Sequence, residues 1–168
     1  MNSNNFDKEK KKILNLVKEK KFLEVIKDGS KLLQQKPDDS EIIRILGITS
    51  INIQNFNEAE KYFNQLLLIE KSADNYYTLG NIQKKIKNYK SAINSFEEAI
   101  KLNPNLSEIH NNLGNTKKLV NKKEDAIFHY KRAISLKHDN IAALMNLASI
   151  LKENNNYEEL INIYNKIL

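Results

Sequence analysis

Residues 75–81 read Asn75-Tyr76-Tyr77-Thr78-Leu79-Gly80-Asn81, and the end of this stretch returns further along the chain as Leu113-Gly114-Asn115. Three downstream positions recur at the same interval, namely Ala92, Phe96 and Ala99, followed by Ala126, Tyr130 and Ala133. A fixed period of about 34 residues is typical of repeat proteins, in which each copy is one supersecondary unit.

Further copies extend the pattern over nearly the whole chain. Upstream, Leu46-Gly47 precedes Leu79-Gly80 by one position less than this interval, and downstream Leu147-Ala148 follows Leu113-Gly114 by the full interval. The first copy is degenerate, because Gly29 takes the position that an aromatic residue fills in later copies. The sequence therefore predicts a disordered N-terminus at 1–5 and five repeats: the degenerate one at 6–39, then 40–72, 73–106, 107–140 and 141–168, the last without a capping helix.

Each copy carries two apolar stripes whose spacings of three and four residues place every stripe on one face of a helix. Gly80 and Gly114 lie inside the first of these helices. A helical Gly costs about 1 kcal/mol relative to Ala, so its recurrence indicates a close approach of the paired helix, with Phe96 and Tyr130 filling the space beside it. The pattern predicts an all-α chain of helix–turn–helix units.

This pattern resembles the tetratricopeptide repeat family, whose helix–turn–helix unit has the same period. The resemblance implies a right-handed superhelical solenoid in which the first helices of the repeats line a concave groove. It also implies a function: a non-enzymatic protein–protein interaction scaffold that binds a peptide segment or a partner domain in that groove.

The resemblance assigns five positions in each repeat to the groove. Asn112 and Asn146, one repeat apart, look like the asparagine ladder in the repeat region of O-linked N-acetylglucosamine transferases, and an Asn amide can pair with any peptide backbone. Thr78 and Ile45 interrupt this row toward the N-terminus. We expect a polar groove of mixed charge, formed by Asn112, Asn146, Asn81, Asn115, Lys84, Lys118, Lys152, Tyr77, Asn111, Asp74 and Glu108.

The carboxylate clamp of chaperone-binding family members is not matched. It requires Lys or Arg three residues before the repeat Gly together with Asn just after it. Here Arg44 is followed by Ile48, and Asn81 is preceded by Tyr77. Capture of chaperone tails is therefore not expected.

No catalytic, cofactor-binding or metal-binding set is predicted. The chain has no Cys, no Gly-rich phosphate loop, and no Ser or Thr with a basic partner that would form a hydrolytic triad. His110, His129 and His138 fall at different repeat positions, and His110 sits where a packed core aromatic belongs. We expect neither an enzyme, nor a cofactor, nor a small-molecule substrate.

The formal net charge of +6 comes mainly from the N-terminal end. Through Lys36 there are ten lysines against five acidic residues, whereas the rest of the chain is close to neutral. This distribution makes nucleic acid a minor alternative, to be tested by the salt dependence of binding. No apolar run of about 18 residues predicts membrane insertion, and no signal peptide is apparent, so a cytoplasmic location is expected.

The last repeat leaves Ile161 and Leu168 without a following copy to cover them. An exposed apolar end favours association, so this face could dock onto a partner or onto a second copy of the chain to form a homo-oligomer. Alternatively, the chain is the substrate-recruiting repeat region of a larger glycosyltransferase- or sulfotransferase-type enzyme, with its catalytic domain elsewhere. The sequence leaves these alternatives open.

Overall fold

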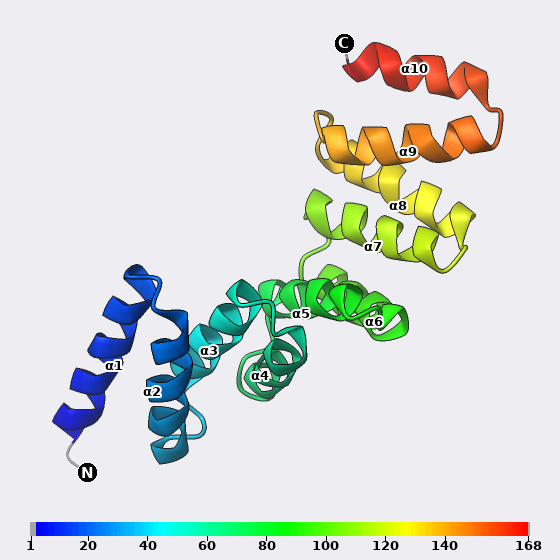
Figure 1. Ribbon diagram of the computed structural model, residues 1–168. Helices are drawn as coiled ribbons and strands as arrows, with labels where there is room; N and C mark the ends of the chain where they lie inside the picture. Colours follow the sequence, from blue (N-terminus) through cyan, green and yellow to red (C-terminus); the bar gives the residue numbers. More distant parts are fainter. Residues whose placement is uncertain (1–2, 168) are drawn as a thin grey trace. The chain divides into compact units, whose positions relative to one another are not determined.

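A computed structural model describes residues 3–167 and shows the predicted all-α chain of helix pairs (Figure 1). The chain forms two compact units, Met1–Ile86 and Lys87–Leu168. Unit 1 contains α1 (Ser3–Lys18), α2 (Phe22–Gln35), α3 (Ser40–Asn52), α4 (Phe56–Ile69) and α5 (Ala73–Lys85). Unit 2 contains α6 (Tyr89–Leu102), α7 (Ser107–Leu119), α8 (Lys123–Leu136), α9 (Ile141–Glu153) and α10 (Tyr157–Ile167).

Within each unit, every helix packs against the next one along the chain. In unit 2, α7 also contacts α9, so the first helices of two consecutive repeats are direct neighbours. Short connections force each pair of successive helices to run antiparallel, which is why the packing follows the order of the sequence.

Polar side chains mark where the helices begin. Six described residues accept a hydrogen bond just before a helix from a backbone N–H three positions later, namely Asp39, Asn55, Ser72, Asn88, Asn140 and Asn156. Such caps satisfy one of the N–H groups that a helix start leaves without a partner, and each is worth about 1 kcal/mol. The frequent Asn of this sequence thus has a structural use at helix starts.

One left-handed residue follows the first helix of every repeat. These residues have φ between 55° and 64° and are Lys20, Gln54, Lys87, Asn121 and Asn155. Beyond Lys20, the N–H of Lys21 donates to the carbonyl of Leu16 at 2.9 Å, as in a Schellman motif. Asn tolerates this conformation, whereas Lys and Gln adopt it at a steric cost of about 1 kcal/mol. The predicted short connections are therefore tight turns without glycine.

The expected close approach at the repeat glycine is confirmed at Gly114. A Cβ atom added there would lie 2.7 Å from Cε1 of Tyr130, whose side chain is fully buried. Only a residue without a side chain fits at this distance from a rigid ring. Gly47 stands in the same relation to Phe63, with 2.9 Å between the added Cβ and Cε2.

The degenerate first repeat is closed in a different way. A Cβ added at Gly29 would lie 2.8 Å from Cδ2 of Leu46, so the missing aromatic is replaced by a leucine of the next repeat. The prediction of a disordered segment at 1–5 is wrong for residues 3–5, because α1 begins at Ser3. Phe6 packs against the core formed by α1, α2 and α3, which explains why the helix extends this far.

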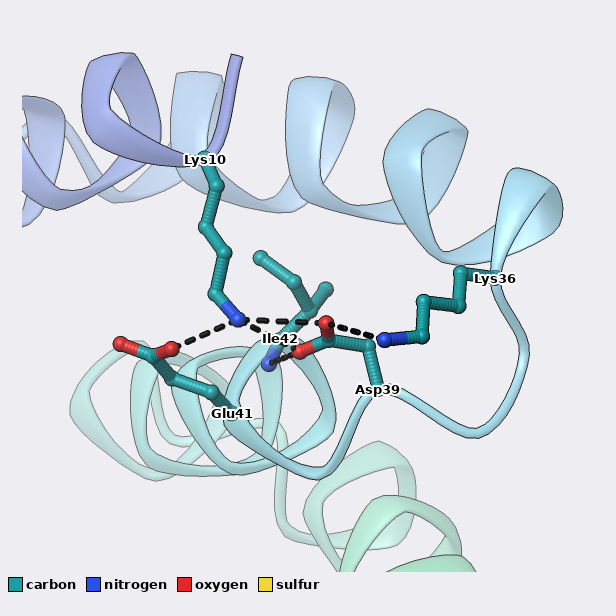
Figure 2. Close-up of polar contacts among 5 residues, drawn as sticks. All are labelled: Lys10, Lys36, Asp39, Glu41 and Ile42. Carbon is teal, nitrogen blue, oxygen red and sulfur yellow. Dashed lines mark hydrogen bonds and ion pairs between the residues drawn. The ribbon is translucent and has the colours of Figure 1, made fainter. Parts of the chain in front are cut away.

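A polar cluster joins α1 to the start of α3 (Figure 2). The Lys10 ammonium donates to Asp39 at 2.9 and 3.1 Å and lies 2.6 Å from Glu41, while Lys36 approaches Asp39 at 3.6 Å. Asp39 is 6% exposed and also accepts from the backbone N–H of Ile42. Burial alone would raise the pKa of Asp39, but the bonds from Lys10 and Ile42 outweigh it and lower that pKa.

Candidate functional site

The predicted groove positions of unit 2 lie on adjoining sides of α7 and α9, here called the first-helix face of unit 2. Two hydrogen bonds cross between these helices. Asn146 Nδ2 donates to Asn111 Oδ1 at 2.9 Å, and Lys118 Nζ donates to Ser149 Oγ at 3.0 Å. The predicted residues of the two repeats are therefore brought together, and Asn146 is bonded to Asn111 of the preceding repeat.

The Asn111–Asn146 pair keeps hydrogen-bonding capacity. A carboxamide has two N–H donors and an acceptor oxygen with two lone pairs, and the observed bond uses one donor and one lone pair. Both side chains are partly exposed, and their neighbours Met145 and Ser149 are exposed. The pair can therefore bond a further polar group from outside the chain.

The predicted lysine row consists of three side chains in different situations. Lys118 lies 3.3 Å from Glu153, which also pairs with Lys123 at 2.8 Å. Lys152 is exposed at the end of α9, while Lys84 is partly buried on α5 of unit 1. Burial, and secondarily the positive charge of Lys85, lower the pKa of Lys84.

The other predicted residues of α7 have separate roles. Asn115 accepts a hydrogen bond from the Tyr130 hydroxyl at 2.8 Å and so supports the core between α7 and α8. Asn112 is partly buried, and its backbone carbonyl accepts from Thr116. Glu108 is exposed in the first turn of α7, where a carboxylate suits the positive end of the helix dipole.

In unit 1 the predicted residues lie along α5. Asp74 is exposed in its first turn, Tyr77 and Asn81 are partly exposed further along, and Lys84 stands in its last turn. Asn81 and Lys84 line a cavity between α3 and α5 that the sequence did not reveal. The acidic and basic positions thus occupy opposite ends of the helix.

Arg44 takes part in an internal polar cluster. Its guanidinium donates to Glu70 and to Asn75, at 2.7 Å in each case. Asn75 is 1% exposed and donates in turn to the backbone carbonyl of Glu70 at 2.9 Å. These bonds account for the buried Asn at the start of the repeat motif, and they engage the cation that a carboxylate clamp would use.

Two histidines form a pair that sequence spacing missed. His110 is 5% exposed, which confirms the prediction of a packed side chain, and its Nδ1 lies 3.2 Å from Nδ1 of His129. One ring must donate and the other accept, so the pair holds at most one proton in this bond. Burial is the main cause that lowers the pKa of His129 to about 4, and the positive charges of His110 and Lys117 lower it further.

Among residues 3–167, no group of three or more His, Cys, Asp or Glu side chains could hold a metal ion.

The face predicted for association is partly described. Ile161 is 59% exposed on α10, whereas Leu160 and Ile163 of the same helix are buried. Leu168 lies outside the described residues.

Within residues 3–167, no helix combines the length and the apolar character that crossing a bilayer requires.

Comparisons with known proteins agree with the repeat pattern. A model of the tetratricopeptide repeat matches residues 73–106, which is one complete copy of the predicted unit. Residues 73–106 are thus matched as one tetratricopeptide repeat, and the chain has the fold of a tetratricopeptide repeat array. A second model, of the Est1 DNA/RNA binding domain, matches residues 92–166. No curated protein sequence matches the chain.

Solved structures share the fold of this chain at low sequence identity. A crystal structure of MamA has a TM-score of 0.87 and 24% identity, with coverage of 91% of this chain and 90% of that one. MamA from Desulfovibrio magneticus RS-1, from residue 41 to its end, has a TM-score of 0.88 and 17% identity, with coverage of 96% and 92%. YrrB, described as a TPR protein with an unusual peptide-binding site, has a TM-score of 0.79 and 17% identity, with coverage of 92% and 80%.

Proposed function

We propose that this chain is a non-enzymatic scaffold that binds an extended segment of another protein along its first helices. The observation that carries the proposal is the Asn111–Asn146 bond, which places two partly exposed amides side by side on α7 and α9. An extended peptide presents alternating N–H and C=O groups, and such amides can pair with both. YrrB, which shares this fold and is a TPR protein with an unusual peptide-binding site, supports the same kind of partner.

The surroundings of the amide pair favour weak binding with little sequence preference in unit 2. Met145, Ser149 and Lys152 are exposed beside it and offer one apolar contact, one hydroxyl and one cation. All three side chains are exposed, so they offer surface contacts rather than a buried site for one particular side chain. Most of the affinity in unit 2 would therefore come from the peptide backbone.

The experiment is site-specific photo-crosslinking of the full chain in extract of its source cell. A photoreactive p-benzoylphenylalanine at Ser149, on the first-helix face of unit 2, should capture protein partners. The same group at Glu124, exposed on α8, is the matched control. Replacing Asn111 and Asn146 together by Ala should remove the Ser149 products while the helix content by circular dichroism stays the same. Equal capture from Glu124, or capture at Ser149 that persists without the amides, would refute the proposal.

Nucleic acid is not proposed as the partner of unit 2, despite the match to the Est1 DNA/RNA binding domain. Residues 92–166 contain ten basic and nine acidic side chains. Several of these basic groups are engaged with carboxylates, as Lys117 is with Glu97 at 3.0 Å and Lys131 with Glu159 at 2.7 Å. Binding to phosphates depends on a surplus of basic groups, which this segment lacks.

A further inference from the structure

A cavity of about 260 Å³ opens between α3 and α5 within unit 1. Its walls combine apolar and polar side chains, which are Ile51, Phe56, Ile82, Thr78, Asn81, Lys84 and Lys85. Pockets that hold drug-sized molecules or cofactors usually measure about 300–1,000 Å³. A cavity slightly below that range is suited to one or two side chains of a bound polypeptide.

The inner part of the cavity is apolar. Ile51 and Phe56 are partly exposed, although both also pack against the core around Leu79 and Ile82. Thr78 contributes no unsatisfied donor, because its hydroxyl donates to the carbonyl of Asp74 at 2.8 Å. An apolar side chain entering the cavity would therefore displace water without breaking a hydrogen bond of the protein.

The apolar surface continues outside the cavity along α3. Ile48 stands three residues before Ile51, so the two side chains lie on the same side of this helix. Ile48 is 46% exposed. Unit 1 thus presents an apolar strip next to the cavity where a polar groove was expected.

The rim of the cavity on α5 is positively charged. Lys84 and Lys85 are adjacent in the last turn, and the effect of Lys85 on the pKa of Lys84 shows that their charges interact. On neighbouring α4, Glu58 pairs with Lys61 at 2.9 Å and Glu60 accepts from Gln83 at 3.0 Å. Asp74, the acidic residue of α5, stands at the opposite end of that helix. The rim is therefore complementary to a negative group.

From this combination we propose that unit 1 selects peptides in which an apolar side chain is followed closely by acidic residues. The apolar side chain fills the cavity, the acidic side chains contact Lys84 and Lys85, and the Asn81 amide bonds the peptide backbone between them. This inference rests on the proposed peptide-binding function and adds a sequence preference to it.

The test uses an array of amidated decapeptides and the full chain. One series carries a central Leu followed by two Glu, and the matched series replace that Leu by Ala or both Glu by Lys. Amidation removes the terminal carboxylate, so binding does not depend on a clamp for the chain end. We expect the Leu–Glu–Glu series to bind at least about tenfold more tightly than either matched series, and its affinity to fall with added salt.

Two variants of the protein place the binding in the cavity. Thr78→Phe fills the cavity and should lower the affinity for the Leu–Glu–Glu series at least tenfold. Lys85→Glu should reverse the charge preference, so that peptides with Lys in place of Glu become the better ligands. Lys71→Glu makes the same change of net charge at an exposed residue before α5 and should leave the preference unchanged. Thermal unfolding by circular dichroism checks that each variant is folded.

The outcomes separate this inference from the proposed function. In one outcome, peptide affinity is unchanged by Thr78→Phe and by Lys85→Glu but is lost when Asn111 and Asn146 are replaced by Ala. This result overturns the inference about the cavity and leaves the proposed function standing. Absence of binding by every series at millimolar peptide overturns both. Loss of binding in Thr78→Phe together with reversal in Lys85→Glu supports both.

Discussion

Replacing Gly114 by Ala should destabilise the protein, although Ala is the better helix former. An added Cβ would lie 2.7 and 2.8 Å from two ring carbons of Tyr130, and 3.2 Å from the backbone oxygen of Ala126. The Tyr130 ring is fully buried, and its hydroxyl is bonded to Asn115, so it has no space into which to turn. Either the ring or the α7–α8 spacing must shift.

The magnitude follows from two opposing terms. Overpacking a filled core costs about 1–3 kcal/mol, and a rigid buried ring together with a backbone oxygen places this site at the upper end. The gain in helix propensity from Gly to Ala is about 1 kcal/mol. We therefore expect Gly114→Ala to lower the free energy of unfolding by about 2 kcal/mol.

Urea denaturation followed by circular dichroism measures this change. With a denaturant slope of about 2 kcal/mol/M, the midpoint should fall by about 1 M. Amide hydrogen exchange should place the loss in α7 and α8. A stability equal to or above that of the unmodified chain would refute the explanation of the repeat glycine.

The same repeat position in α9 offers a matched control. Ala148 occupies the place of Gly114 one repeat later, and the corresponding aromatic, Tyr164, is 44% exposed rather than packed. Ala148 itself is 3% exposed, so Ala148→Gly loses a buried methyl as well as helix propensity and should cost about 2 kcal/mol. In a Tyr130→Leu background the penalty of Gly114→Ala should shrink, giving a coupling free energy of about 1 kcal/mol or more.

Three further changes test the polar features of the fold. Asp39→Ala removes a helix cap and the partner of Lys10, and should lower the unfolding free energy by about 2 kcal/mol in urea denaturation. An effect below about 0.5 kcal/mol would contradict a stabilising role for the polar cluster of Lys10, Lys36, Asp39 and Glu41. The pKa of His129 falls from 6.5 to about 4 on folding, so between these pH values the folded state binds fewer protons than the unfolded state. The contribution of neutral His129 to stability is therefore fully present above pH 6.5. The free energy of unfolding should decrease by about 2–3 kcal/mol as the pH falls toward 4. His129→Gln should flatten the dependence of stability on pH, whereas the control His138→Gln, at an exposed residue, should not. Equal pH profiles for the unmodified chain and the two variants would rule out the histidine pair as the cause. Gln54 has a left-handed backbone conformation that Gly adopts without steric cost, so Gln54→Gly should raise the free energy of unfolding by about 0.5–1 kcal/mol and increase the urea midpoint. A lower midpoint would show that the turn is not strained.

The sequence alone determined the repeating part of this structure. The repeat period predicted the helix pairs, the close contact at Gly114 and the buried position of His110, because each copy must solve the same packing problem with the same residue types. The repeat period reveals only those residue types that recur at equivalent positions in the copies. The family resemblance, rather than the period, assigned groove positions along α5, α7 and α9, and that assignment stays a prediction.

The tertiary structure decided the features that occur once. Asn146 bonds to Asn111, His110 contacts His129, and a cavity with apolar and polar walls opens between α3 and α5. Each of these depends on rotamers and on neighbours from another helix, and it leaves no periodic trace because no other repeat carries the same pair. The fold of this protein is a property of its repeated residues, whereas its proposed selectivity is a property of its unrepeated ones.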